Sequence, residues 1–431
     1  MSTRDTASVL RDQEFLRYFA SRLLSVAGTI VTLVTLPIIV YRTSGSASLT
    51  ALVAAAEAAP YLLFGLFSGA LTDRWNRKKV MVTADILSTL LVATVPLADL
   101  LGKLTVPHVL AVAFLGPTIG VFFDGAVFGA LPTLVGRSRI AEANSLTWAA
   151  ASVVEMVMPS AVGVLLAFVH PAWLLGFDAL TFALSAVLIG GISRPMHDAT
   201  RERPPLTVRQ VFRDIREGLD YLVRHAGVRT FTIIGFLQCL GAGGFVALMV
   251  VWIDQRLEVG TAGLRFGLVF GSWGVGGLLA SLALPLLIHR FAAARIALAA
   301  LPVAAAIGML VPLITTWWVA GVTLVFWGFF YQLVVINSVT YRQQVTPEAL
   351  LGRVNTAGRM LAWGCGWTGG ALLAGALVGW LGLVPTLFVL ASTGVLATVV
   401  AWTSPLRGMV TGSAVAPSPA EDTTRQRPRV D

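Results

Sequence analysis

Twelve apolar runs, each close to the length that crosses the hydrocarbon core of a bilayer, dominate this sequence. They cover residues 15–40, 50–72, 79–101, 105–130, 142–168 and 172–192, and then 229–253, 264–288, 294–313, 317–340, 353–379 and 383–403. A membrane helix needs about 20 residues, and lipid offers no partner to an unpaired backbone group, so each run predicts a transmembrane helix. The sequence therefore predicts an all-α polytopic membrane protein with two groups of six helices.

The composition agrees with a membrane protein and argues against several other classes. Hydrophobic residues make up 56% of the 431 residues and charged residues 12%, whereas soluble domains have about 25% charged residues. The net charge of +9 does not indicate nucleic-acid binding, because the cations recur between apolar runs. Cys239 and Cys365 lie far apart inside such runs, which predicts packing residues without a disulfide or a metal site. No nucleotide-binding loop or nucleophile–base arrangement is evident, so we expect no enzyme activity and no cofactor.

The distribution of Lys and Arg predicts which side of the membrane each loop faces. With the N-terminus inside, 27 of the 31 cations fall in cytoplasmic segments, and the outside loops hold only Arg42, Lys103, Arg256 and Arg265. Cytoplasmic loops of membrane proteins carry an excess of Lys and Arg. We therefore expect a multi-pass protein of the plasma membrane with both termini in the cytoplasm.

Two polar segments divide the chain. In residues 193–228, the stretch from Val208 to Arg224 has apolar residues at helical spacing, which predicts an amphipathic helix along the membrane surface. Ser, Pro, Thr and mixed charges at the C-terminal end predict a disordered tail. The expected domains are an N-terminal six-helix bundle (1–192), a cytoplasmic linker (193–228), a C-terminal six-helix bundle (229–404) and a cytoplasmic tail (405–431).

The short loop between the second and third runs carries the most specific motif. Residues 69–79 read GALTDRWNRKK, so the segment contains Gly69, Asp73, Arg74, Arg77 and Lys78. A glycine before the loop lets helix backbones approach closely, and Asn76 tolerates the left-handed backbone of a turn. Asp73 can pair with Arg77 or face the N-terminus of a neighbouring helix.

This spacing resembles the loop signature of the major facilitator superfamily, G-x-L-x-D-R-x-G-R-K, with Asn76 in place of the usual glycine. The resemblance implies two six-helix bundles related by an axis along the membrane normal, with a substrate site between them. It also implies that the loop is an inner gate, in which an acid at the inner end of the fourth helix pairs with the loop arginine. Asp124 is placed for that pairing, opposite Arg77.

Further stretches are similar to one branch of the superfamily, the twelve-helix drug:proton antiporters that include macrolide-efflux proteins. These stretches are LPTLVGRSRIAEANSL (131–146), FDALTFALSA (177–186), REGLDYLVRHAGVR (216–229) and GRVN (352–355). One departure is in the fifth helix, where Met158 to Gly163 keeps only the proline and the last glycine of the pattern G-P-x-x-G-G. The resemblance implies a monomer that exports small amphipathic compounds by exchange with protons.

Ionisable residues inside the runs are candidates for proton coupling, since a charge in the hydrocarbon costs at least ~2.5–3.5 kcal/mol. Glu155 and Glu57 lie deepest, and Arg22 on the first run is a candidate cationic partner of either. Asp85 lies about 9 Å from the inner face, at about 1.5 Å per residue, and is a further candidate. Asp178 on the sixth run is expected to be structural. The alternative for these residues is a static buried pair.

Polar and aromatic residues of the second half outline a candidate substrate cavity, namely Gln238, Trp327, Tyr331, Gln332, Asn337, Trp363 and Trp367. A cavity lined by aromatic groups with few polar ones suits a lipophilic ligand, and packing is the alternative for each residue. The glycines that follow Gln238, at 241, 243 and 244, predict a flexible or broken point in that helix. Two other functions remain open: an uptake symporter or lipid flippase on the same fold, and a non-transporting membrane receptor or scaffold.

Overall fold

The computed structural model describes residues 9–72, 74–136, 139–196, 208–288 and 290–407. Within these ranges, 12 helices are long and apolar enough to cross a membrane. They coincide with the twelve runs predicted from the sequence. The predicted disordered tail lies outside the described residues, apart from its first three positions.

The first six spans are α1 (Gln13–Ser44), α2 (Ala47–Thr72), α3 (Arg77–Leu100), α4 (Val106–Val135), α5 (Ile140–Leu165) and α6 (Pro171–Gly190). Five of the later spans are α8 (Ala226–Gln255), α9 (Leu264–Ile288), α10 (Ala293–Leu310), α11 (Trp317–Val345) and α14 (Leu383–Thr403). The eleventh span is composite and consists of α12 (Glu348–Arg359), a π-helical turn η4 (Met360–Cys365) and α13 (Gly366–Leu381). A crosswise helix, α7 (Val208–Arg224), joins the two groups, and short 3₁₀ turns are η1 (Val9–Arg11) and η3 (Val311–Leu313).

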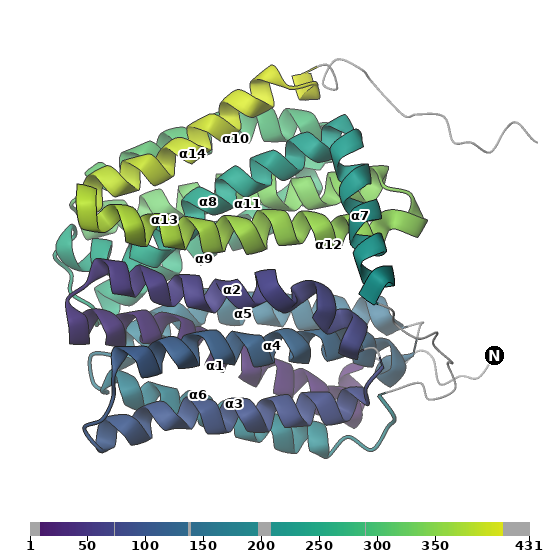
Figure 1. Ribbon diagram of the computed structural model, residues 1–431, viewed down its shortest axis with the longest axis vertical. Coiled ribbons are helices and arrows are strands. Elements are labelled where there is room, and N and C mark those ends of the chain that lie inside the picture. The colour runs from purple at the N-terminus through teal and green to yellow at the C-terminus, as the bar shows by residue number, and fades with distance from the viewer. Residues whose placement is uncertain (1–8, 73, 137–138, 197–207, 289, 408–431) are drawn as a thin grey trace, which may run out of the picture.

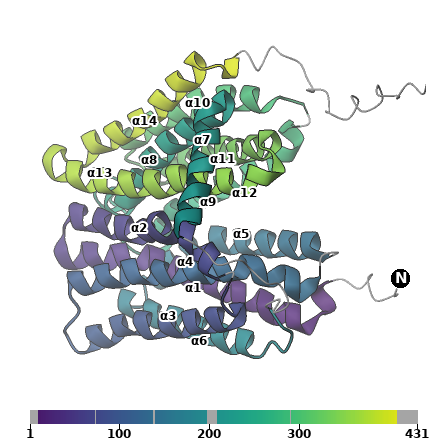
Figure 2. The ribbon, with the colours of Figure 1, turned by 45° about the vertical axis from the view of Figure 1, so that its right-hand side comes forward.

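The spans form two bundles, one made of α1 to α6 and the other of α8 to α14. Figures 1 and 2 show the two bundles from two directions. In the first bundle α6 packs on α1 and α3, and α2 packs on α4. In the second, α8 packs on α13 and α14, and α11 packs on α9 and α10. The bundles meet where α5 lies on α9 and where α2 lies on α13. This arrangement confirms the predicted fold class.

Short polar side chains set the starts of α1 and α3. The Asp12 carboxylate accepts the N–H of Glu14 at 3.1 Å, which satisfies one of the open donors at the start of α1. Asn76 accepts the N–H of Lys79 at 3.1 Å in the same way. Its backbone is extended, with φ −65° and ψ 106°, so the left-handed turn considered for Asn76 is not formed. The residue caps a helix instead.

The predicted break at the glycines of α8 is wrong, because α8 runs without interruption from Ala226 to Gln255. The glycines serve close packing. A Cβ atom on Gly243 would lie 2.7 Å from Cα of Trp367 on α13, and one on Gly241 would lie 2.7 Å from the carbonyl oxygen of Leu390 on α14. The local irregularity falls instead at η4, in the eleventh span. Small residues here let helix backbones approach closely.

α7 occupies the predicted amphipathic stretch, but the described part of its apolar side lies on protein. Figure 1 shows α7 crosswise to the spans at the end of the molecule where α12 begins. Leu222 is buried in a cluster with Val228 and Val354, and the Tyr221 hydroxyl donates to the carbonyl oxygen of Val345 at 2.8 Å. α7 is therefore docked on the second bundle, because α8 and α12 offer it an apolar surface.

Candidate functional site

Polar contacts join the two bundles at the predicted outer end. The Tyr41 hydroxyl on α1 donates to Oδ2 of Asp254 on α8 at 2.7 Å, and Gln255 Nε2 donates to the same hydroxyl at 3.1 Å. Arg42 Nε donates to Oγ1 of Thr261 at 2.8 Å. These contacts hold the end of α1 against α8 and the loop that follows it.

Next to these contacts, α5 and α9 meet through their backbones at a group of residues that we call the glycine seam: Ser160, Gly163, Gly263 and Gly267. The N–H of Gly263 donates to the carbonyl oxygen of Gly163 at 2.7 Å, and Ser160 Oγ donates to that of Gly267 at 3.0 Å. A Cβ atom on Gly267 would lie 2.8 Å from Cα of Ser160, which is closer than carbon atoms pack. Gly163, the one glycine that the chain keeps from the fifth-helix pattern, thus lets the backbones of α5 and α9 lie close together.

The predicted gating-loop residues surround the start of α3. Gly69 lies in α2, and Asp73 falls outside the described residues. Arg74 is exposed, whereas Arg77 is buried. The Arg77 guanidinium donates to the carbonyl oxygen of Gly129 on α4 at 2.7 Å, in space that a Cβ atom at Gly129 would fill. Arg77 therefore ties the start of α3 to α4.

Lys78 fastens α3 to the end of α6. Its Nζ donates to the carbonyl oxygen of Ile192 at 2.7 Å, and Arg17 of α1 donates to that of Gly191. The last carbonyl groups of a helix have no partner within the helix and carry partial negative charge. The two cations satisfy carbonyl groups just past the end of α6 and join three helices there.

Arg22 on α1 pairs with Asp124 on α4, with 3.4 Å between Nη1 and Oδ1. Its guanidinium also lies 5.5 Å from the ring centroid of Phe123. The predicted pairing of Asp124 with Arg77 is therefore corrected: Arg77 reaches Gly129, which lies about 7.5 Å nearer the inner end of α4 at about 1.5 Å per residue. The side chains of Arg22 and Asp124 are 21% and 37% exposed, so the pair is partly accessible.

The two glutamates predicted to couple protons lie in different surroundings. Glu155 on α5 is exposed and lies within electrostatic reach of Arg22, which brings residues of α1, α4 and α5 into one charged group. Glu57 on α2 is 8% exposed, and its Oε1 has no hydrogen-bond partner among the described residues. The direct contact of Arg22 is thus with Asp124, and its partnership with a glutamate stays a prediction.

Two buried aspartates lie within the first bundle between α6 and its neighbours. Asp85 of α3 accepts a hydrogen bond from Ser185 of α6 at 2.6 Å. Asp178 of α6 accepts hydrogen bonds from Thr32 of α1 and, at 3.2 Å, from Thr181. Both carboxyl groups are held by hydroxyl groups, and no sequence pattern indicated these partners.

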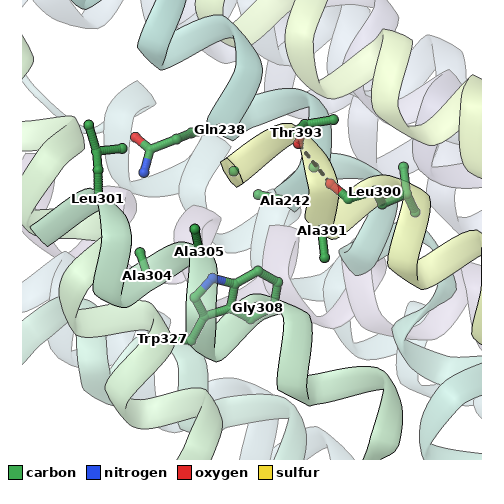
Figure 3. A pocket seen from close by; sticks show the side chains of 12 residues that line it. Gln238, Ala242, Leu301, Ala304, Ala305, Gly308, Trp327, Leu390, Ala391 and Thr393 are labelled. Atoms are coloured by element: carbon green, nitrogen blue, oxygen red, sulfur yellow. Dashed lines mark hydrogen bonds between the residues drawn. The ribbon is translucent and has the colours of Figure 1, made fainter. Parts of the chain in front are cut away.

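Gln238 and Trp327 line one small cavity inside the second bundle, between α8, α10, α11 and α14 (Figure 3). Its other walls are largely small residues, such as Ala304, Ala305 and Gly308. The cavity holds about 30 Å³, which is room for about two water molecules. Ligand pockets have volumes of about 300–1,000 Å³, so this cavity is too small for a drug-sized compound.

Trp327 and Tyr331 belong to an aromatic cluster that also contains Phe245 and Trp273. The ring centroids of Trp273 and Trp327 are 4.6 Å apart, and those of Phe245 and Trp327 are 4.9 Å apart. Tyr331 makes an edge contact with Trp273 at 5.3 Å. Sequence reasoning missed Phe245 and Trp273, although the glycines around Trp273 could have marked it as a site of close helix packing.

The remaining cavity candidates are spread over several contacts. Asn337 is fully buried and donates to the carbonyl oxygen of Ala293 at 2.7 Å, so it serves the start of α10. Gln332 is partly exposed and faces α9. Trp363 and Trp367 stack at 5.5 Å along the eleventh span, where Trp363 is 50% exposed. The structure thus brings the tryptophans together in two separate groups.

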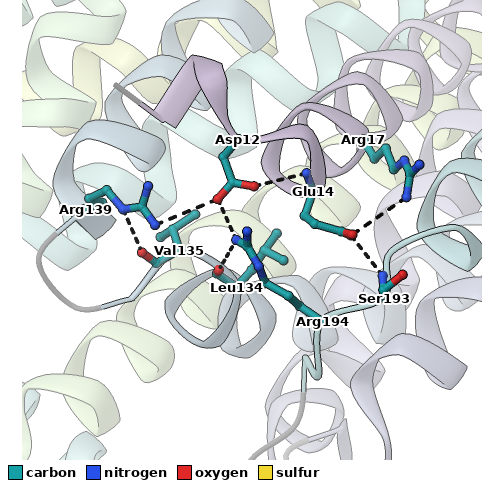
Figure 4. A network of polar contacts seen from close by, with 8 residues as sticks. All are labelled: Asp12, Glu14, Arg17, Leu134, Val135, Arg139, Ser193 and Arg194. Atoms are coloured by element: carbon teal, nitrogen blue, oxygen red, sulfur yellow. Dashed lines mark hydrogen bonds and ion pairs between the residues drawn. The ribbon is translucent and has the colours of Figure 1, made fainter. Parts of the chain in front are cut away.

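A network that we call the inner clamp ties the start of α1 to the segment after α6 (Figure 4). Arg194 donates to Asp12 at 2.5 Å, Arg139 lies 3.8 Å from the same carboxylate, and Glu14 accepts the N–H of Ser193 at 2.9 Å. Burial by itself would raise the pKa of Asp12, but the hydrogen bond and charge of Arg194 outweigh it and hold the pKa below its ordinary value. The same hydrogen bond raises the pKa of Arg194.

Known proteins resemble this chain in sequence and in fold. A family model described as "Transmembrane secretion effector" matches residues 5–423. The multidrug efflux pump Tap of Mycolicibacterium fortuitum is 28% identical over 390 residues, covering 87% of this chain and 91% of Tap. The enterobactin exporter EntS of Shigella boydii serotype 18 is 29% identical over 333 residues, covering 74% of each chain.

A solved structure shows the likeness in fold. The nucleoside transporter NupG superposes with a TM-score of 0.72 at 11% identity, covering 93% of this chain and all of the NupG chain. At that identity the likeness concerns the fold alone. The family match spans nearly the whole chain, and the two-bundle fold agrees with it. The chain belongs to the transmembrane secretion effector family of major facilitator superfamily transporters.

Proposed function

We propose that this transporter exports small amphipathic compounds, either drug-like and antibiotic-like molecules or a secondary metabolite, in exchange for protons. The observation that carries the proposal is the Arg22–Asp124 pair, which is partly exposed within transmembrane helices and has Glu155 within electrostatic reach. Charged groups at such depth are costly and are retained where they serve transport. The names of Tap and EntS, an efflux pump and an exporter, support export as the direction.

Glu155 is the first candidate for the residue that carries the coupling proton, and Glu57 is the second. The charge of Arg22 attracts an ionised Glu155, so any movement of Arg22 relative to α5 changes how readily Glu155 binds a proton. Asp124 competes with Glu155 for the same guanidinium. A cationic or polar part of the substrate that enters this group would redistribute these contacts and release a proton.

The structure has the features of a state that faces the cytoplasm. The contacts of Tyr41 and Arg42 and the glycine seam close the predicted outer end. On the other half of α5, the side chains of Asn144, Ser145 and Trp148 are exposed. In the opposite state the inner ends would meet, and the loop around Arg77 would act there as a latch. The protein works as a monomer in the plasma membrane, with both termini in the cytoplasm.

The substrate would bind between the bundles, where the exposed face of Trp363 and the partly exposed Gln332 are available to a lipophilic ligand. Binding there does not use the small cavity beside Gln238. That cavity lies within one bundle and holds too little space.

The experiment is transport of the lipophilic cation ethidium into proteoliposomes with an imposed pH gradient. Glu155→Gln should abolish gradient-driven ethidium transport while ethidium still binds to the purified protein. Glu57→Gln is measured in parallel, and Asp99→Asn is the matched control, because Asp99 lies at the far end of α3 and pairs with His170. Transport by both glutamate variants at the wild-type rate would assign the coupling proton to other residues.

A further inference from the structure

We propose that Asp85 is a buried proton-binding site, connected by a chain of serine hydroxyl groups to the helix that carries Arg22, and that Arg22 links its proton occupancy to the making and breaking of the contact between Arg22 and Asp124. The inference rests on the proton coupling of the proposed function. It assigns to that coupling a second proton site, which lies inside the first bundle and not between the bundles. Three helices of the first bundle, α1, α3 and α6, meet along a row of polar side chains that we call the polar seam: Ser21, Ser25, Thr32, Asp85, Asp178, Thr181 and Ser185.

A short chain of hydrogen bonds crosses these helices. Ser185 of α6 donates to Oδ2 of Asp85 on α3 at 2.6 Å. On its other side, Ser185 Oγ lies 2.9 Å from Ser21 Oγ and accepts from Ser25 Oγ at 3.2 Å, both on α1. All four side chains are buried, with Asp85 at 2% and Ser21 and Ser185 at 0% exposure. An ionisable group within a membrane span is costly, so this buried carboxyl group and its hydroxyl partners are a candidate functional feature.

The geometry suits a carboxyl group that gains and loses a proton. A buried carboxylate needs several donors or a cation, and the hydrogen bond from Ser185 supplies one donor. With a proton on Oδ2, Asp85 is neutral and can donate to Ser185, which then donates to Ser21. With the proton lost to water, Ser185 donates to the carboxylate and receives from Ser21 and Ser25. Each hydroxyl group has one proton to donate and two lone pairs that accept, so it serves in both arrangements.

Arg22 connects this chain to the site between the bundles. It follows Ser21 directly on α1, acts electrostatically on Asp85, and makes its direct contact with Asp124 on α4. The guanidinium that acts on Glu155 and pairs with Asp124 therefore also acts on Asp85. When a cationic substrate displaces Arg22 from Asp124, the charge of Arg22 becomes available to Asp85 and favours loss of its proton. When the substrate leaves, Arg22 returns to Asp124 and Asp85 rebinds a proton from water.

Asp178 provides the contrast within the same seam. It is also fully buried between α1 and α6, and hydroxyl groups of Thr32 and Thr181 hold it. Among the residues that the structure describes, no charged group acts on it as Arg22 acts on Asp85. Asp178 is therefore a matched control with similar burial and similar partners.

The test is an infrared pH titration of the full-length protein in lipid nanodiscs without substrate, following the carbonyl stretch of protonated carboxyl groups. Asp85→Asn should remove one titrating band that Asp178→Asn leaves in place. Ser185→Ala should raise the midpoint of that band by about one pH unit or more, because the carboxylate loses a hydrogen-bond donor. Asp124→Asn should lower the midpoint, because Arg22 loses its direct partner and its charge is then shared only between Glu155 and Asp85.

The last variant separates a linked proton site from a structural aspartate, whose midpoint would not follow a change on α4. A full set of bands in Asp85→Asn, or an unchanged midpoint in Asp124→Asn, would overturn the inference. Because no substrate is present, the result is independent of ethidium transport. A titrating Asp85 in a protein that shows no proton-driven transport would contradict the proposed function and leave the proton site standing.

Discussion

Gly267→Ala should shift the protein away from the state in which its predicted outer end is closed. The new Cβ atom would lie 2.5 Å from the carbonyl oxygen of Ser160 and 2.8 Å from its Cα. Both contacts involve backbone atoms of α5, so rotation of a side chain cannot relieve them. The glycine seam must therefore open by several tenths of an ångström or more.

The magnitude follows from the cost of overpacking. Forcing one methyl group into a tight contact costs about 1–3 kcal/mol. If the open-outside state has room for that methyl group, the whole cost acts on the equilibrium between the two states, which is a factor of about 5–150. The glycine seam also holds the hydrogen bonds from Gly263 to Gly163 and from Ser160 to Gly267. Loss of these hydrogen bonds would further favour the state in which the outer end is open.

Spin labels across the outer end provide the assay. Cysteines replace Ser44 at the end of α1 and Val259 in the loop after α8, in a background where Cys239 and Cys365 are alanine. Double electron–electron resonance then gives the distribution of distances between the two labels. Gly267→Ala should increase the population at long distance at the expense of the short one.

Gly120→Ala on α4 is the matched control, because its Cβ would meet no atom within 4 Å. It makes the same change in helix propensity as Gly267→Ala, and that change favours the helix by up to about 1 kcal/mol. The control should leave the distances unchanged. Equal distance distributions for Gly267→Ala and the wild-type protein would refute the steric argument.

Three further predictions concern the inner end and the topology. Asp12→Asn should lower the free energy of unfolding by about 1 kcal/mol near neutral pH, since the inner clamp loses a charge while asparagine keeps the helix cap. Because the pKa of Asp12 is depressed in the folded protein, the difference from wild type in thermal unfolding should shrink as the pH falls below about 4 and vanish below the folded-state pKa. Arg77→Ala and Asp73→Asn should each slow ethidium transport in inserted protein, with a double variant less than additive if the two residues pair, and full activity in both single variants would exclude a latch. Ser138→Cys should react with impermeant thiol reagents only from the cytoplasm and Thr43→Cys only from outside, and outside labelling of Ser138 would reverse the topology.

The sequence was sufficient for the twelve spans because the physical constraint on them is local. Each span must satisfy its own backbone in lipid, so length and apolar composition are enough to locate it. The loop motif likewise placed Arg77 and Lys78 just before the third span, and in the structure they begin α3. It could not give their partners, which are the carbonyl groups of Gly129 within α4 and of Ile192 just past the end of α6.

Glycines show the limit of local reasoning most clearly. Those of α8 suggested a flexible helix, yet they are places where α13 and α14 approach the backbone. Gly163 looked like a remnant of a motif, yet it accepts a hydrogen bond from Gly263 on the other bundle. A glycine has the same sequence signature in a hinge and in a tight contact, and only the neighbouring helix distinguishes them.

The sequence by itself determined which segments cross the membrane, where the scarce charges lie along them and which superfamily the chain resembles. The tertiary structure decided the partners: Arg22 with Asp124, and Asp85 with Ser185. Partner choice depends on how helices rotate and pack against one another, and small residues at many positions allow several packings with similar local energies. A side chain's depth can be counted from the sequence, whereas the helix face it meets is set by the packing of the whole bundle.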